Sequence, residues 1–107
     1  MTLTLQEYKI KAKDIKKYSN PDEVARKAKE YFNTDKPVYL STEKAKKYMV
    51  EDPNGKWIHF GAFGMEDYTK HNDKHRQNSY LKRSTNIKGN WKDNPYSPNN
   101  LSIHLLW

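Results

Sequence analysis

The chain has 107 residues and a mass of 12.7 kDa, which is enough for one domain and too little for two independent hydrophobic cores. Leu, Ile, Val and Phe make up only 18 of these residues, a level at which disorder has to be considered. Fourteen aromatic side chains argue against disorder, because each ring buries a large area, and we expect a folded domain with a thin core built on rings. Cysteine, a long apolar run and a secretory leader pattern are all missing, so we expect a soluble intracellular protein with neither disulfides nor a membrane partner.

The net charge is +7, from 20 Lys and Arg against 13 Asp and Glu, and only Arg26, Arg76 and Arg83 among the cations are arginines. Lysine is a hydrated point charge that suits phosphate groups, whereas bidentate reading of base edges favours arginine. Residues 1–50 carry +5 of this charge and residues 51–107 carry +2. The composition therefore favours contact with the backbone of a polyanion, which attracts the basic half of the chain.

Residues 3–13 alternate apolar and polar side chains, the period-two pattern of a half-buried strand. On a strand, Lys9, Lys11 and Lys13 would share one face. Five cations fall within nine residues here, next to Tyr8 and Tyr18: Lys9, Lys11, Lys13, Lys16 and Lys17. We therefore divide the chain into a basic N-terminal segment, residues 1–19, and a single α+β domain, residues 20–107.

A helix is predicted near residues 20–33, because a capping residue precedes Pro21 and acidic residues fill the first turn. A short strand is predicted over residues 37–41. A β-hairpin is predicted over residues 46–60, since Asp52–Gly55 reads Asp-Pro-Asn-Gly and has the composition of a tight turn.

Two further helices are predicted, one near residues 72–84 and a short one over residues 101–107, separated by a loop that contains aromatic rings. The order of elements has no β-α-β periodicity, so we expect an α+β fold in which an antiparallel hairpin or sheet packs against two to three helices. The expected members of the core are Trp57, Phe60, Tyr68, Tyr80, Leu81 and Trp91.

From about Pro37 onward the sequence carries an uncommon pattern: Asp-Tyr-Thr-x-His-x-Asp at residues 67–73, followed by Arg76, Tyr80-Leu81, Arg83 and Trp91, and finally Leu105-Leu106-Trp107. The pattern resembles a small uncharacterised family of large (nucleocytoplasmic) double-stranded DNA viruses of eukaryotes. The resemblance covers about two-thirds of the chain. It departs from the family at Ser84, where His is common, and at residues 101–104, where a Trp-rich stretch is common. It implies a viral protein located in the virion or in the cytoplasm or nucleus of the infected cell, and it implies no particular reaction.

His71 and His75 lie four residues apart, so on a helix they would share a face as zinc-binding His pairs do, with His59 as a conceivable third ligand. The competing interpretation makes Asp73 or Asn72 a helix cap and His71 the partner of a loop. We expect no bound metal and no other cofactor. We also expect no catalysis, because the sequence has neither cysteine nor a nucleophile elbow nor a glycine-rich phosphate loop.

Arg76, Tyr80 and Arg83 follow a spacing of i, i+4 and i+7, which places two guanidinium groups and a ring on one helical face. Such a face could grip phosphates or stack on a base. It could equally tie the helix to Asp67 or Glu66, and we place this structural interpretation first.

The hypothesis that follows is a small, basic, non-enzymatic protein that binds DNA or RNA backbone without sequence preference, in packaging or in the virion core. The expected nucleic-acid contacts are Lys9, Lys11, Lys13, Lys16, Lys17, Arg76, Lys82 and Arg83. The alternative is a minor virion or adaptor protein that contacts other virion proteins through Trp91, Tyr96 and Trp107. A second alternative is a metal-dependent nuclease built on His71 and His75.

Overall fold

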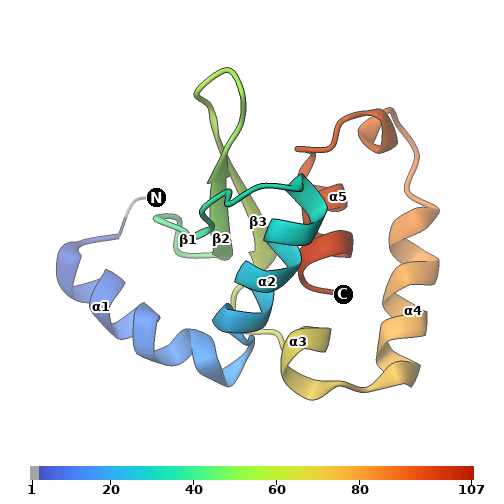
Figure 1. Ribbon diagram of the computed structural model, residues 1–107. Helices are drawn as coiled ribbons and strands as arrows, with labels where there is room; N and C mark the ends of the chain where they lie inside the picture. Colours follow the sequence, from blue (N-terminus) through green and yellow to red (C-terminus); the bar gives the residue numbers. More distant parts are fainter. Residues whose placement is uncertain (1–2) are drawn as a thin grey trace.

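A three-stranded antiparallel sheet in the order β1-β2-β3 lies at the centre of the structure, a computed structural model that describes residues 3–107 (Figure 1). The strands are β1 (Tyr39–Leu40), β2 (Lys46–Glu51) and β3 (Trp57–Ala62). Between β2 and β3 the Asp52 carboxylate accepts hydrogen bonds from the N–H groups of Asn54 and Lys56, both at 2.9 Å, and Gly55 adopts a φ of 82°. The predicted hairpin is thereby confirmed.

The helices are α1 (Leu5–Asp14), η1 (Ile15–Lys17), α2 (Pro21–Phe32), α3 (Tyr68–His71), α4 (Lys74–Thr85), η2 (Trp91–Asp93) and α5 (Pro98–Leu105). Asn20, Asp73 and Ser97 are the N-caps of α2, α4 and α5, and each side chain accepts a hydrogen bond from a first-turn N–H. The predicted helices near 20–33 and 72–84 are confirmed, and so is the α+β fold class.

The expectation of a strand over residues 3–13 is wrong, because these residues form α1. Thr4 and Glu7 make a reciprocal capping box: the Thr4 hydroxyl accepts from the Glu7 N–H at 3.2 Å, and the Glu7 carboxylate accepts from the Thr4 N–H at 3.0 Å. The side chains that turn inward are Tyr8, Lys11 and Ile15, at spacings of three and four, so the helical period overrides the apparent alternation.

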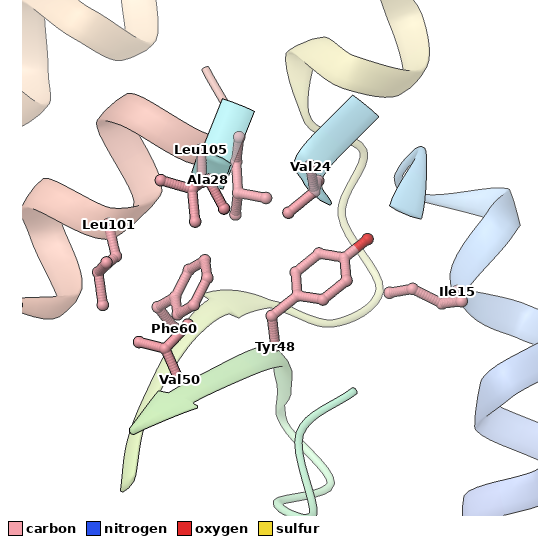
Figure 2. Close-up of a cluster of buried hydrophobic side chains, with 9 residues drawn as sticks. Ile15, Val24, Ala28, Tyr48, Val50, Phe60, Leu101 and Leu105 are labelled. Carbon is pink, nitrogen blue, oxygen red and sulfur yellow. The ribbon is translucent and has the colours of Figure 1, made fainter. Parts of the chain in front are cut away.

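The hydrophobic core lies between the sheet and the two helices α2 and α5, as Figure 2 shows. Strands β2 and β3 contribute Tyr48, Val50 and Phe60, with Tyr48 and Phe60 directly opposite each other in the ladder. The other members are Ile15, Val24, Ala28, Leu101, Leu105 and Leu106. Ile15 belongs to η1, so the basic N-terminal segment packs on the same core as the rest of the chain.

Of the six residues expected in the core, only Phe60 is fully buried there. Trp57 is 41% exposed, because it sits opposite Glu51 next to the turn of the hairpin, and it packs edge-on against Tyr39 with 5.7 Å between the ring centroids. Trp91 is half-buried in η2, where its indole N–H donates to the Ile87 carbonyl at 2.6 Å. Tyr68, Tyr80 and Leu81 are also half-buried and lie outside the core cluster.

A buried ion pair fixes the segment that leads into α3 and α4. The Lys47 ammonium lies 2.9 Å from the Asp67 carboxylate, and the two side chains are 3% and 0% exposed. Asp67 also caps α3 by accepting hydrogen bonds from the N–H and the hydroxyl of Thr69. The hydroxyls of Ser19, Thr69 and Tyr48 continue the same buried network. Asp67, the first residue of the uncommon pattern, therefore serves the fold.

Candidate functional site

Helix α4 carries an excess of positive charge on an exposed element. Its twelve residues include Lys74, Arg76, Lys82 and Arg83 and contain no carboxylate; the nearest acid is the N-cap Asp73. Only Ser84 is buried in this helix. The helix is fastened along one row, where Gln77 donates to the carbonyl of Trp107 at 2.6 Å and Asn99 of α5 donates to the carbonyl of Ser84 at 3.0 Å. Most of α4 therefore faces solvent.

A groove of about 480 Å³ lies between α4, the end of β3 and α5. The inner side of α4 forms one wall, and Lys46, Gly61 and Ala62 belong to the opposite wall. Figure 1 shows α4 on one flank of the molecule, with α1 on the other. The polar and aromatic residues that line the groove are Lys46, Lys47, Phe60, Glu66, His75, Arg76, Ser79, Tyr80, Arg83, Asn99, Ser102 and Trp107.

The exposed cations of the groove, Lys46, Arg76 and Arg83, have little acidic compensation, whereas the buried Lys47 is paired with Asp67. Arg76 lies 3.4 Å from the Glu66 carboxylate, and both side chains are over 40% exposed, so the pair contributes little to stability. Within residues 3–107 the guanidinium of Arg83 has no hydrogen bond or ion pair, and the Lys46 ammonium has no ion pair. The expected internal tie is thus confirmed for Arg76, through Glu66, and is wrong for Arg83.

Four rings form a series that ends in the groove. The ring of Tyr68 lies edge-on to His71, with 6.0 Å between the ring centroids, and the centroids of His71 and Trp107 are 5.2 Å apart. Trp107 stacks on Tyr80 with 4.2 Å between the centroids and an interplanar angle of 9°. Burial lowers the pKa of His71, and Arg76 lowers it further. The Nδ1 atom of His71 accepts from the Asp73 N–H at 2.9 Å, so the neutral ring carries its proton on the buried Nε2. His71 therefore adds no charge to the groove at neutral pH.

The lysines of the N-terminal segment do not share one face. Lys9, Lys13, Lys16 and Lys17 are exposed, whereas Lys11 is 5% exposed. The Lys11 ammonium donates to the carbonyls of Ser41, Glu43 and Lys46 at 2.5–2.9 Å.

Burial lowers the pKa of Lys11 to about 8, against the opposing effect of the Glu43 carboxylate. The expectation that Lys11 meets a phosphate is therefore wrong, because all three of its donors are used inside the protein.

Helices α1 and α4 lie on opposite flanks of the molecule, so the exposed lysines of α1 and the cations of α4 are carried by separate flanks (Figure 1). Lys17 is paired with Asp14 at 3.2 Å, which leaves a row of Lys9, Lys13 and Lys16. Lys82 is exposed on α4 outside the groove lining.

The three rings expected at a partner surface take part in three separate contacts. Tyr96 stacks on Phe32 at 5.1 Å, Trp107 stacks on Tyr80, and Trp91 lies in η2 with the Lys92 ammonium 5.5 Å from its ring. Tyr96 and Trp107 also pack against the core.

No three His, Asp or Glu side chains within residues 3–107 come together as ligands for a metal ion. His59 lies in the sheet, with its Nδ1 2.7 Å from the Ser41 hydroxyl, while His75 is exposed on α4. In the same part of the chain, none of the helices has the length and apolar character that crossing a bilayer requires.

Residues 36–84 match the model of a family described as a family of unknown function, DUF5754. The matched residues run from the approach to β1 into α4 and include the Asp-Tyr-Thr-x-His-x-Asp segment and both arginines of the groove. The similarity of this part of the chain to an uncharacterised family is thereby confirmed. No curated protein and no solved structure matches the chain.

The far wall of the groove was not predicted from the sequence. Lys46 and Asn99 are distant from α4 along the chain, and only the tertiary fold brings them to it. One signal was present in the sequence: residues 74–85 contain four Lys and Arg without a single acid.

Proposed function

We propose that this protein binds the phosphate backbone of nucleic acids without sequence preference, through the groove beside α4. The observation that carries the proposal is the pair Arg76 and Arg83, which line one wall of the groove on either side of Tyr80. Guanidinium groups bind phosphate oxygens with two parallel hydrogen bonds, so two of them along one wall favour a ligand with repeated phosphates.

The electrostatic balance of the groove supports the same ligand. Within residues 3–107 the Arg83 guanidinium is not paired with a carboxylate, so its contact with a phosphate would break no ion pair. Arg76 would give up only its exposed contact with Glu66, and such pairs contribute about 0–1 kcal/mol. Lys46 adds a third cation from the opposite wall.

The setting of this activity follows from the resemblance to a family of large DNA viruses. We place the protein in packaging or in the virion core, as a binding protein without catalytic turnover. The row Lys9, Lys13 and Lys16 on α1 and η1 would add a weaker second contact with the same polyanion. The alternative is contact with another virion protein through aromatic residues. The absence of nucleic-acid binding in the test below would favour this alternative.

The test measures binding of fluorescently labelled 20-nucleotide DNA, single-stranded and duplex, by anisotropy at about 50 mM salt, where electrostatic binding is strongest. The variant Arg76→Gln/Arg83→Gln should lose about a hundredfold or more in affinity, because it removes at least two charged hydrogen bonds that contribute about 1.5–3 kcal/mol each. The matched control Lys56→Gln/Lys88→Gln removes two exposed cations outside the groove and should bind like the wild type.

The variant Lys9→Gln/Lys13→Gln separates the two flanks and should lose about threefold or less, since screened lysine contacts are the weaker ones. No measurable binding at low salt would overturn the proposal. Loss of binding in the α1 variant with full binding in the α4 variant would move the interface to α1.

A further inference from the structure

We infer that the groove takes a single strand of nucleic acid, with one unpaired base stacked on the ring of Tyr80. This inference rests on the proposed function and adds to it the class of nucleic acid. It is carried by the place of Tyr80 at the end of the ring series and by the positions of the two arginines around it.

Tyr80 is the last ring of the series Tyr68, His71, Trp107 and Tyr80, and within residues 3–107 it has no further aromatic partner. One face of its ring is covered by Trp107 in a near-parallel stack. Tyr80 also lines the groove and is only half-buried, so part of the residue is accessible to a ligand there. A nucleobase placed on that surface would extend the stack by one member, and every base has the flat face that this requires.

Arg76 and Arg83 stand on either side of this ring along the helix axis. With a rise of about 1.5 Å per residue, Arg76 lies about 6 Å before Tyr80 and Arg83 about 4.5 Å after it. Both guanidinium groups are therefore placed to reach the phosphates that flank a nucleotide whose base lies on Tyr80. A ring between two cations is the arrangement by which sequence-tolerant single-strand binders hold a base and its backbone together.

A duplex does not fit this arrangement. Its bases are stacked on one another and show only their edges in the grooves, so a base must leave the stack before a ring can cover its face. The groove, at about 480 Å³, has the size of a site for one small ligand. The structure therefore favours a strand whose bases are already unpaired.

The experiment compares four probes of twelve units with the wild-type protein at one salt concentration: oligo(dT), oligo(U), an abasic oligodeoxynucleotide and a DNA duplex. Oligo(dT) should bind about tenfold more tightly than the abasic strand, which corresponds to about 1.4 kcal/mol for the lost stack. It should also bind more tightly than the duplex, compared per phosphate. A tenfold preference between oligo(dT) and oligo(U) would assign the groove to DNA or to RNA, and equal affinity would assign it to both.

Variants then place the effect on the ring. Tyr80→Leu should lose the preference for oligo(dT) over the abasic strand, whereas Tyr80→Phe keeps the ring and should retain it. The matched control is Tyr39→Leu, which removes an exposed ring from the pair with Trp57, away from the groove, and should change nothing. Circular dichroism checks that each variant is folded, and if Tyr80→Leu is not, the abasic probe with wild-type protein still decides.

The two claims fail in different ways. If no probe binds at low salt, or if Arg76→Gln/Arg83→Gln binds like the wild type, the proposed function fails. If binding depends on the arginines but the abasic strand and the duplex bind as tightly as oligo(dT), backbone binding stands and the stacking inference is overturned.

Discussion

Replacing Lys47 by Met should destabilise the protein severely, although the residue lies in a strand and Met has nearly the same shape. The substitution removes one partner of a pair whose side chains are 3% and 0% exposed and whose charged atoms lie 2.9 Å apart. Oδ1 of Asp67 keeps its hydrogen bonds from Thr69, but Oδ2 is left as a buried, uncompensated charge. Breaking a buried pair in this way costs about 3–5 kcal/mol.

Urea unfolding followed by tryptophan fluorescence measures this cost directly. With an entropy of unfolding of about 2.1 cal/mol/K per residue, the same loss lowers the melting temperature by about 13–22 °C. The double variant Lys47→Met/Asp67→Asn should recover at least half of the loss, because the amide still caps α3 and no buried charge remains. A loss below about 1 kcal/mol for Lys47→Met, at an unchanged dependence on urea, would refute the assignment of this pair to the interior.

Three further predictions concern the fold. Gly61→Ala should lower the free energy of unfolding, measured in urea, by about 2–4 kcal/mol. Gly61 has a φ of 82°, and a new Cβ would lie 2.8 Å from a methyl carbon of Leu106. A loss under about 0.5 kcal/mol would contradict this contact. Phe60→Ala should lower the free energy of unfolding by about 3–5 kcal/mol and Trp57→Ala by about 1 kcal/mol, because Phe60 is buried and Trp57 is 41% exposed. The reverse order would contradict the assignment of Phe60 to the buried face of the sheet. In a nuclear magnetic resonance titration, Lys11 of the folded protein should lose its proton near pH 8. Between about pH 8 and pH 10.5 the unfolded chain binds more protons than the folded protein, so the stability of the wild type relative to Lys11→Met should rise with pH across this window. A titration midpoint above pH 10 for Lys11 would contradict its burial.

Local signals in the sequence were sufficient for the elements they specify. The turn Asp52–Gly55 and the cap before Pro21 act within a few residues, so the hairpin and α2 could be predicted. The apolar residues of the N-terminal helix fit both a strand period and a helical period, and the capping box at Thr4 and Glu7 decides for the helix.

Burial depended on contacts that composition does not reveal. Large rings at Trp57 and Trp91 were expected inside, yet the core is completed by Leu101, Leu105 and Leu106 of the C-terminal segment. Which face of a strand is covered is decided by the helices that pack on it, and these come from distant parts of the chain.

The candidate site was half visible in the sequence. The spacing of Arg76, Tyr80 and Arg83 placed them on one helical face, and the structure puts all three on one wall of the groove. The opposite wall, including Lys46, and the stack of Trp107 on Tyr80 depend on tertiary packing, so no pattern in the sequence could have indicated them.

The salt dependence of binding tests the central claim most directly, because it counts the phosphates that the groove neutralises. On a single strand each neutralised phosphate contributes about −0.7 to the slope of log affinity against log salt, so three groove cations predict a slope near −2 for the wild type. Arg76→Gln/Arg83→Gln should flatten this slope by about 1.4, with the fold intact by circular dichroism. An unchanged slope in this variant, with flattening in Lys9→Gln/Lys13→Gln instead, would contradict the assignment of the interface to the groove beside α4.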